Sequence, residues 1–313
     1  MYFPVAGIEV NPFLPPAVAF FISFFTSMAG VSGAFLLLPF QVSILGFNSP
    51  AVSGTNHLFN IVAIPSGVYR YIKEGRMVWP LTWVVIIGTL PGVLIGAIFR
   101  IQYLPDPRSF KMFAGVVLLY IGSRMLKNLY AKEDSGGSQS RSEDQFQKIV
   151  NQSKKESEGD HLPKVHTKKI SFLSIEYEFY GQDFRINTAG IMALSFFVGI
   201  IGGIYGIGGG AIIAPFFISV FKLPVYTVAG AALMGTFVTS AAGVLFYQLI
   251  APYYPDMAVA PDWALGFLFG IGGFGGMYCG ARLQKFISAR IIKWILTGCI
   301  LFTAAKYMVE FVR

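Results

Sequence analysis

The feature that most constrains this chain is a glycine-rich run of ten residues that occurs twice. GVSGAFLLLP begins at Gly30, and GIGGGAIIAP begins at Gly206, 176 positions later. Each run lies within about 33 mostly apolar residues, which would form a helix of roughly 50 Å, whereas a bilayer core is about 30 Å thick. Clustered glycines weaken a helix and permit positive φ angles. The pattern therefore predicts a helical hairpin at each run, with the glycines at its tip.

Each predicted tip would present unpaired backbone N–H groups at the start of the second helix of its hairpin. These groups, with the partial positive charge of a helix N-terminus, can bind an anion without any charged side chain. For any single glycine, close packing between membrane helices is an equally good explanation. A nucleotide-binding loop is a poorer one, because neither run is followed by Lys-Ser or Lys-Thr or preceded by a soluble strand.

Composition places the chain among polytopic membrane proteins. Hydrophobic residues make up 54% of it and charged residues only 13%, with a mean hydropathy of +0.61. The N-terminus lacks the basic region of a secretory signal peptide. The two cysteines, Cys279 and Cys299, lie in apolar segments, so we expect neither a disulfide framework nor a metal site. The net charge of +8 comes with no aromatic-interleaved basic patch, which argues against nucleic acid as a partner.

The chain divides into two similar halves around a central insert. Residues 1–130 are predicted to form a first transmembrane repeat and residues 188–313 a second, each a glycine-tipped hairpin followed by three transmembrane helices. The expected spans after the hairpins are residues 50–71, 78–99, 108–129, 225–251, 262–285 and 289–311. The predicted fold is thus an all-α polytopic membrane protein.

The insert at residues 131–187 differs from both halves. Up to about residue 169 it is polar, charged and poor in large apolar side chains, which is typical of a loosely ordered linker. Residues 170–187 alternate apolar and polar positions around Gly181, which predicts a small soluble β-hairpin beside the membrane.

A second glycine pattern follows each hairpin. Gly88, Gly92 and Gly96 recur every four residues, and the second half repeats the spacing at Gly272, Gly276 and Gly280. This spacing lines one face of a helix. We therefore interpret these glycines as packing positions rather than as a site.

Charge indicates how the two halves are oriented. If each tip is a hairpin, the halves have inverted topologies, and the insert and the basic loops share the cytoplasmic side, as the positive-inside bias requires. These loops contain Arg70, Lys73 and Arg76 in the first half and Arg282, Lys285, Arg290 and Lys293 in the second. Arg100, Arg108 and Lys111 fall on the opposite side. Inverted repeats with broken helices are typical of alternating-access transporters, so we expect a multi-pass transporter of the inner (plasma) membrane.

The paired runs, the segments AVSGTN and TVAGAA downstream of them, and the glycine-spaced helices resemble the TauE/SafE sulfite exporter family of bacterial permeases. The resemblance covers the chain apart from the insert. It implies transport of a small sulfur-containing anion such as sulfite, a sulfonate or sulfoacetate. The first run has Ser32 where the second has Gly208, a departure from the glycine-rich pattern that would bear on selectivity.

The candidate substrate site combines the tips with polar residues of the following span in each half. Hydroxyl and amide groups can donate to anion oxygens. The alternative is that they bond helix backbones or one another. The candidates are Gly30, Ser32, Gly33, Ala34, Thr55, Asn56, His57, Asn60, Gly208, Gly209, Gly210, Thr236, Thr239 and Ser240. Because Ala231, Ala232 and Leu233 stand where the first half has Thr55, Asn56 and His57, we expect an asymmetric site.

His57 is the one ionisable side chain well inside a predicted span, since the others lie near span ends where they can reach the interface. It could carry a coupling proton or serve as a neutral hydrogen-bonding group. No cofactor is expected, and a homo-oligomer is possible.

Two other classes of function remain open. The segment from Gly30 to Gly33 fits the GxSG pattern of rhomboid-like intramembrane serine proteases, with His57 as a conceivable base. The second repeat has Gly208 and Leu233 at the corresponding positions, so it lacks both the nucleophile and the base, and a protease would not explain the duplication. An anion channel or a non-transporting membrane scaffold is the other alternative, and saturable slow flux would argue against a channel.

Overall fold

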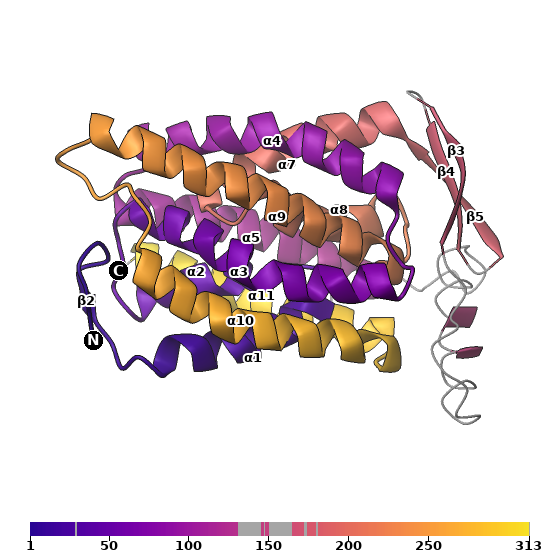
Figure 1. Ribbon diagram of the computed structural model, residues 1–313, viewed down its shortest axis with the longest axis horizontal. Coiled ribbons are helices and arrows are strands. Elements are labelled where there is room, and N and C mark those ends of the chain that lie inside the picture. The colour runs from indigo at the N-terminus through magenta and orange to yellow at the C-terminus, as the bar shows by residue number, and fades with distance from the viewer. Residues whose placement is uncertain are drawn as a thin grey trace.

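The computed structural model describes residues 1–28, 30–130, 145–146, 148–149, 165–171, 174–179 and 181–312. Most of this chain forms a bundle of roughly parallel helices (Figure 1). The long elements are α1 (Leu14–Met28), α2 (Ala34–Ser43), α3 (Ala51–Lys73), α4 (Trp79–Gln102), α5 (Pro107–Tyr130), α7 (Thr188–Tyr205), α8 (Gly209–Ser219), α9 (Val225–Ile250), α10 (Trp263–Leu283) and α11 (Ala289–Val312). Short 3₁₀ turns follow α9 (η1, Ala251–Tyr253) and α10 (η2, Gln284–Phe286).

The bundle has two distinct ends. Both chain termini lie at one, which we call the termini end, and the three-stranded sheet lies at the other, the sheet end (Figure 1). Helix α1 follows β2 at the termini end, whereas α7 follows β5 at the sheet end. The main helix pairs are α4 with α7, α1 with α10, α3 with α10, α5 with α11, and α3 with α9. Each of these pairs joins a helix of the first half to one of the second.

Small antiparallel sheets flank the bundle. At the termini end β1 (Tyr2–Phe3) pairs with β2 (Ile8–Glu9). At the sheet end β3 (His166–Ile170), β4 (Ser174–Phe179) and β5 (Gln182–Asn187) pair in the order β3-β4-β5.

The sheet confirms the predicted β-hairpin and adds one strand to it. Gly181, at a φ of 71°, makes the turn between β4 and β5. The third strand corrects the expectation of a linker up to about residue 169, since β3 begins at His166. Its segment HTKKI has one large apolar residue, so its pattern gave no strand signal; the remainder of that linker lies almost entirely outside the described residues.

Both glycine runs break a helix, as predicted. The first break separates α1 from α2, and the second separates α7 from α8. Gly30 has a φ of 71° in the first break, and Gly206 and Gly208 have φ angles of 73° and 78° in the second. Left-handed values of this kind favour glycine, because an L-residue with a Cβ is strained there.

The glycines spaced by four are packing positions, as expected. A Cβ built on Gly92 or Gly96 of α4 would overlap the backbone of α7, at Phe196 and Ile200 respectively. On α10, a Cβ on Gly276 would overlap the Phe20 carbonyl of α1. These contacts bring the backbones of α4 and α7, and of α10 and α1, close together.

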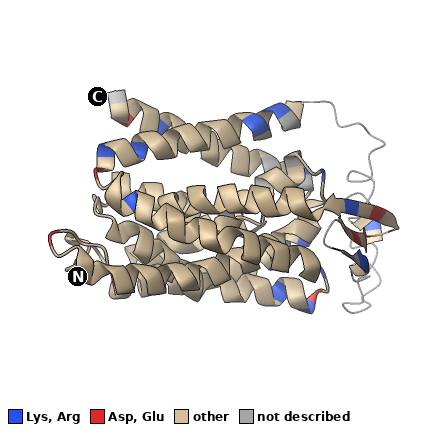
Figure 2. Cartoon of the chain, turned by 90° about the horizontal axis from the view of Figure 1, so that it is seen from above, with Lys and Arg blue, Asp and Glu red and all other residues tan. Residues whose placement is uncertain are grey.

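Six helices in the described chain are long and apolar enough to cross a membrane: α4, α5, α7, α9, α10 and α11. The segment 188–205, which becomes α7, was expected to be half of a hairpin, yet it qualifies by length and hydropathy. The 23-residue α3 was expected to span but does not qualify, because its polar side chains lower its hydropathy. Charged residues gather toward the two ends of the bundle (Figure 2).

Three arginines near helix ends depart from the expectation that they reach the interface. Arg70, Arg76 and Arg100 are only 7%, 1% and 1% exposed. Their side chains fold back among neighbouring helices, and their surroundings at the two ends of the bundle differ.

Candidate functional site

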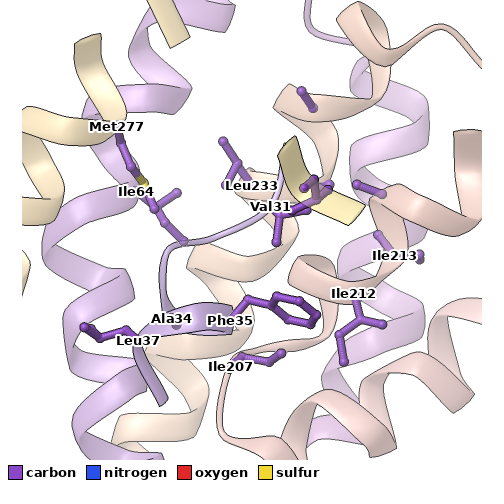
Figure 3. Close-up of a cluster of buried hydrophobic side chains, with 14 of the residues drawn as sticks. Val31, Ala34, Phe35, Leu37, Ile64, Ile207, Ile212, Ile213, Leu233 and Met277 are labelled. Atoms are coloured by element: carbon purple, nitrogen blue, oxygen red, sulfur yellow. The ribbon is translucent and has the colours of Figure 1, made fainter. Parts of the chain in front are cut away.

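The two helix breaks meet inside the bundle. Val31 of the first break and Ile207 of the second are buried, and both lie in one cluster of apolar side chains drawn in Figure 3. Phe35, in the first turn of α2, stacks on Tyr205 at the end of α7, with ring centroids 6.0 Å apart. The breaks are therefore held in a largely apolar surrounding, in which each polar side chain needs a partner.

Asn60 of α3 connects the two breaks. Its amide nitrogen donates to the carbonyl oxygen of Ile207 at 3.1 Å and to the hydroxyl of Ser240 at 3.0 Å. Its amide oxygen accepts a hydrogen bond from Ser32 of the first break. Asn60, Ser32, Ile207 and Ser240 thus form one buried network from both breaks, α3 and α9, which we call the central network.

His57 extends the central network by one residue. Its Nδ1 lies 3.2 Å from the Ser240 hydroxyl, while Nε2 is buried without a hydrogen-bond partner among the described residues. The ring faces Gly243 of α9, where a Cβ would come within 2.8 Å of it, and lies 6.0 Å from the Tyr247 ring. His57 therefore has one nitrogen committed to the network and one available.

A second polar pair lies beside this network. Gln41 of α2 donates to the Asn56 side chain at 2.6 Å, but Gln41 Oε1 and Asn56 Nδ2 are buried without partners. The sequence singled out Asn56 and missed Gln41. An amide in the apolar segment that forms α2 was the signal that could have identified it.

The three candidate threonines bond mainly to helix backbone. Thr55 donates to the Ala51 carbonyl at 2.8 Å and accepts from the Asp262 amide at 2.9 Å. Thr236 and Thr239 donate to carbonyl groups one turn earlier in α9. Thr55 lies apart from the central network, but Thr239 does not, because the Thr239 and Ser240 hydroxyls both lie close to Gly208.

Gly208 packs closely against three hydroxyl-bearing residues of α9. A Cβ there would come within 3.0 Å of the Ser240 hydroxyl, 3.1 Å of the Thr239 hydroxyl and 3.1 Å of the Thr236 methyl carbon. Gly208 is also the N-cap of α8, and it supplies no side-chain cap to the first turn. The α8 N-terminus therefore begins beside three candidate residues without a capping oxygen from its own N-cap.

The remaining tip glycines are packed against neighbouring helices. A Cβ on Gly30 would overlap Ala229 of α9, and one on Gly33 would overlap Ser23 of α1. A Cβ on Gly209 would lie 2.5 Å from the Thr89 Cβ, and one on Gly210 would overlap the Ala232 carbonyl. At Ala34 the backbone nitrogen donates to the Ser32 hydroxyl at 3.1 Å. Larger side chains at these positions would disturb folding as well as the binding of any ligand.

The geometry does not favour a serine protease. The Ser32 hydroxyl bonds Asn60, and the His57 ring bonds Ser240 instead of Ser32. A nucleophile and its base need to be within hydrogen-bond reach of each other. Within the described residues, no group of three or more His, Cys, Asp or Glu side chains is placed to hold a metal ion. The central network offers neutral hydroxyl, amide and imidazole groups, which suits recognition of a polar or anionic solute.

A family model described as sulfite exporter TauE/SafE matches residues 16–307. The chain is 21% identical over 292 residues to a probable membrane transporter protein, YunE, of Bacillus subtilis (strain 168), covering 91% of this chain and 92% of that one. It is 27% identical over 122 residues to another probable membrane transporter protein, YdhB, of the same organism, covering 38% of this chain and 46% of that one. No solved structure matches.

Proposed function

The chain belongs to the sulfite exporter TauE/SafE family, and from this premise we propose that it is a secondary transporter of small sulfur-containing oxyanions such as sulfite, a sulfonate or sulfoacetate. Membership makes it a multi-pass membrane transporter. The substrate class is part of the proposal. We place the protein in the inner (plasma) membrane, with residues 131–187 on the cytoplasmic side.

The observation that carries the proposal is the central network between the two helix breaks. Asn60 bonds Ser32 of one break and the Ile207 carbonyl of the other. A movement of either break would therefore change a hydrogen bond of the same residue. The oxyanion would bind beside the α8 N-terminus, near Gly208, Ser240 and Thr239. Hydrogen-bond donors from side-chain hydroxyls and backbone N–H groups, together with the partial positive charge at the α8 N-terminus, would compensate its charge.

Residues 1–130 and 188–313 would act as inverted repeats that rock against each other. The opposite starting ends of α1 and α7, and the pairing of α1 with α10 and of α7 with α4, support this arrangement. Exchange of conformations between such halves exposes one central site to either side in turn. His57, with its available Nε2, is the candidate for a coupling proton.

The test is flux of radiolabelled sulfite, sulfoacetate, taurine and sulfate into proteoliposomes. Ser32→Ala and Ser240→Ala each remove one hydroxyl of the central network. Loss of a hydrogen bond to a charged ligand is worth about 1.5–3 kcal/mol, so we expect Ser240→Ala to raise KM roughly tenfold or more. Ser32→Ala acts on the site only through Asn60 and should raise KM by a smaller factor. Ser66→Ala is the matched control, because Ser66 is a buried hydroxyl of α3 that bonds carbonyls of Ala63 and Phe274.

Saturable flux that both network variants weaken and Ser66→Ala leaves within about twofold would support the proposal. Flux that rises linearly with concentration, accompanied by single-channel currents, would identify an anion channel. Wild-type protein that moves none of these anions would exclude the proposed substrate class.

A further inference from the structure

Arg100 lies near the end of α4 at the termini end, on the side of the protein where the positive-inside bias disfavours it. Its side chain is buried. The guanidinium lies over the Phe110 ring of α5, 4.1 Å from its centroid, and Nη1 donates to the Leu104 carbonyl. Nε has no hydrogen-bond partner in the part of the chain that the structure describes. These contacts leave part of the donor capacity of the guanidinium unused.

No acidic side chain among the described residues forms an ion pair with Arg100. Asp106 is near enough to interact electrostatically, but it is exposed to solvent. Burying a charge is unfavourable by several kcal/mol unless an opposite charge and hydrogen bonds compensate it. Phe110 and one carbonyl compensate only part of that penalty.

Two buried tyrosines lie near Arg100 and interact with it electrostatically. Tyr247 of α9 packs with Ala97 and Ile101, the α4 residues on either side of Arg100. Tyr307 of α11 lies against Gly115 of α5, the helix whose Phe110 contacts the guanidinium. Within the described residues neither hydroxyl makes a hydrogen bond of acceptable geometry, although the Ser53 hydroxyl lies close to Tyr247. Three donors with unused capacity therefore gather from three different helices. Each is nine-tenths buried or more.

This cluster lies close to the central network. The Tyr247 ring is 6.0 Å from the His57 ring, and His57 bonds Ser240. On the other side of Arg100, the Phe110 ring is 6.1 Å from the Tyr205 ring, where α7 ends and the second break begins. An anion held at the cluster would be one residue away from the central network.

We propose that Arg100, Tyr247 and Tyr307 form a second oxyanion subsite, between the central network and the termini end, through which the anion enters or leaves. The inference rests on the proposed transport function. The guanidinium supplies a positive charge and unused N–H groups, and the two phenols supply O–H donors, so a small oxyanion would satisfy all three. A bound anion would also compensate the buried charge of Arg100.

The experiment counts sulfite bound per chain by equilibrium dialysis of purified full-length protein with radiolabelled sulfite. We expect two sulfite ions bound to wild type and one to Arg100→Gln, because glutamine keeps a donor for the Leu104 carbonyl and removes the charge. Arg108→Gln is the matched control, since Arg108 is an exposed arginine at the same end. It should bind two. A double variant, Tyr247→Phe with Tyr307→Phe, should weaken the same binding event at least tenfold.

If Arg100→Gln binds as much sulfite, as tightly, as wild type, the subsite is refuted and the transport proposal stands. If folded Arg100→Gln loses all binding, the cluster is no separate subsite. Wild type that neither binds nor transports any sulfur oxyanion would refute the proposed function and the subsite with it. If Arg100→Gln does not fold, the double tyrosine variant decides, and unchanged binding there would overturn the inference.

Discussion

The two ends of the bundle hold buried arginines in opposite ways. At the sheet end, Arg70 and Arg76 each contact Glu74 at 2.6 Å, and Lys285 approaches the same carboxylate at 3.8 Å. At the termini end, Arg100 has no ion-pair partner in the described part of the chain. Because an uncompensated buried charge is destabilising, the presence of an ion-pair partner at one end and its absence at the other indicate different roles for these arginines. The sheet-end arginines hold the fold together, and Arg100 is suited to meet a charge that arrives from outside.

The sheet-end network also reaches the first helix break. Arg76 donates to Gln284 at 2.5 Å, and Gln284 donates to the carbonyl of Met28, the last residue of α1, at 2.5 Å. Tyr71 donates to the neighbouring Ser27 carbonyl at 2.9 Å. The α3–α4 loop, η2 and the end of α1 are therefore joined by buried polar contacts. If the substrate leaves or enters at the sheet end, these contacts would have to break to open a path for it.

The largest effect on stability is expected from Glu74→Gln. This change leaves Arg70 and Arg76 buried beside an uncharged amide, and breaking a buried pair in this way destabilises by about 3–5 kcal/mol. The measurement is the free energy of unfolding from SDS titration in mixed micelles.

The control is Glu310→Gln, since the Glu310 side chain is 27% exposed. It pairs with Lys111 at 2.8 Å and Lys306 at 3.7 Å and accepts a hydrogen bond from Ser43 at 2.9 Å. A pair of that kind is worth about 0–1 kcal/mol. Equal losses for the two variants would remove the contrast between a structural network and an ordinary surface pair.

The sequence predicted most of the fold because its strongest signals are local. Glycines placed both helix breaks, since φ preference and helix propensity depend on the residue itself. Span ends came from apolar blocks, and β4 and β5 from alternation around Gly181. The strand β3 was missed because its segment has no such alternation, and its pairing with β4 is a tertiary contact.

The candidate site was predicted as a set of residues but not as a network. The sequence marks Ser32 as the tip position that is glycine in the second half, and Asn60 and Ser240 as polar groups in apolar spans. Nothing in the chain order says that Asn60 joins both breaks. Arg100 was interpreted as an interfacial residue because it lies near a span end. Its burial depends on Phe110 and on side chains of α9 and α11, which only the packing of distant helices brings together.

A smaller effect is expected from Tyr177→Phe at the sheet end. The Tyr177 hydroxyl of β4 lies 3.2 Å from the Thr227 hydroxyl of α9, and burial raises its pKa above the usual range. Loss of one hydrogen bond of this kind should lower the free energy of unfolding by about 1 kcal/mol. The matched control is Tyr103→Phe, because Tyr103 at the termini end is exposed. If both variants unfold alike, the sheet does not help to hold its end of the bundle.

The smallest change in stability is expected from Arg100→Met. Methionine fills a similar length beside Phe110 and leaves no opposite charge without a partner, because Arg100 has no ion pair among the described residues. Loss of the hydrogen bond to Leu104 is offset by removal of a buried charge, so the free energy of unfolding should stay within about 1 kcal/mol of wild type.

Sulfite flux of Arg100→Met should nevertheless fall at least tenfold, as expected if the charge serves the passing anion and not the fold. Stability and flux are measured on the same preparation, by SDS titration and in proteoliposomes. A loss of 3 kcal/mol or more, on the scale of a broken buried pair, would place Arg100 with the structural arginines of the sheet end. Unchanged stability with reduced flux would keep the two ends distinct, because the same side chain would then be dispensable for folding and required for transport.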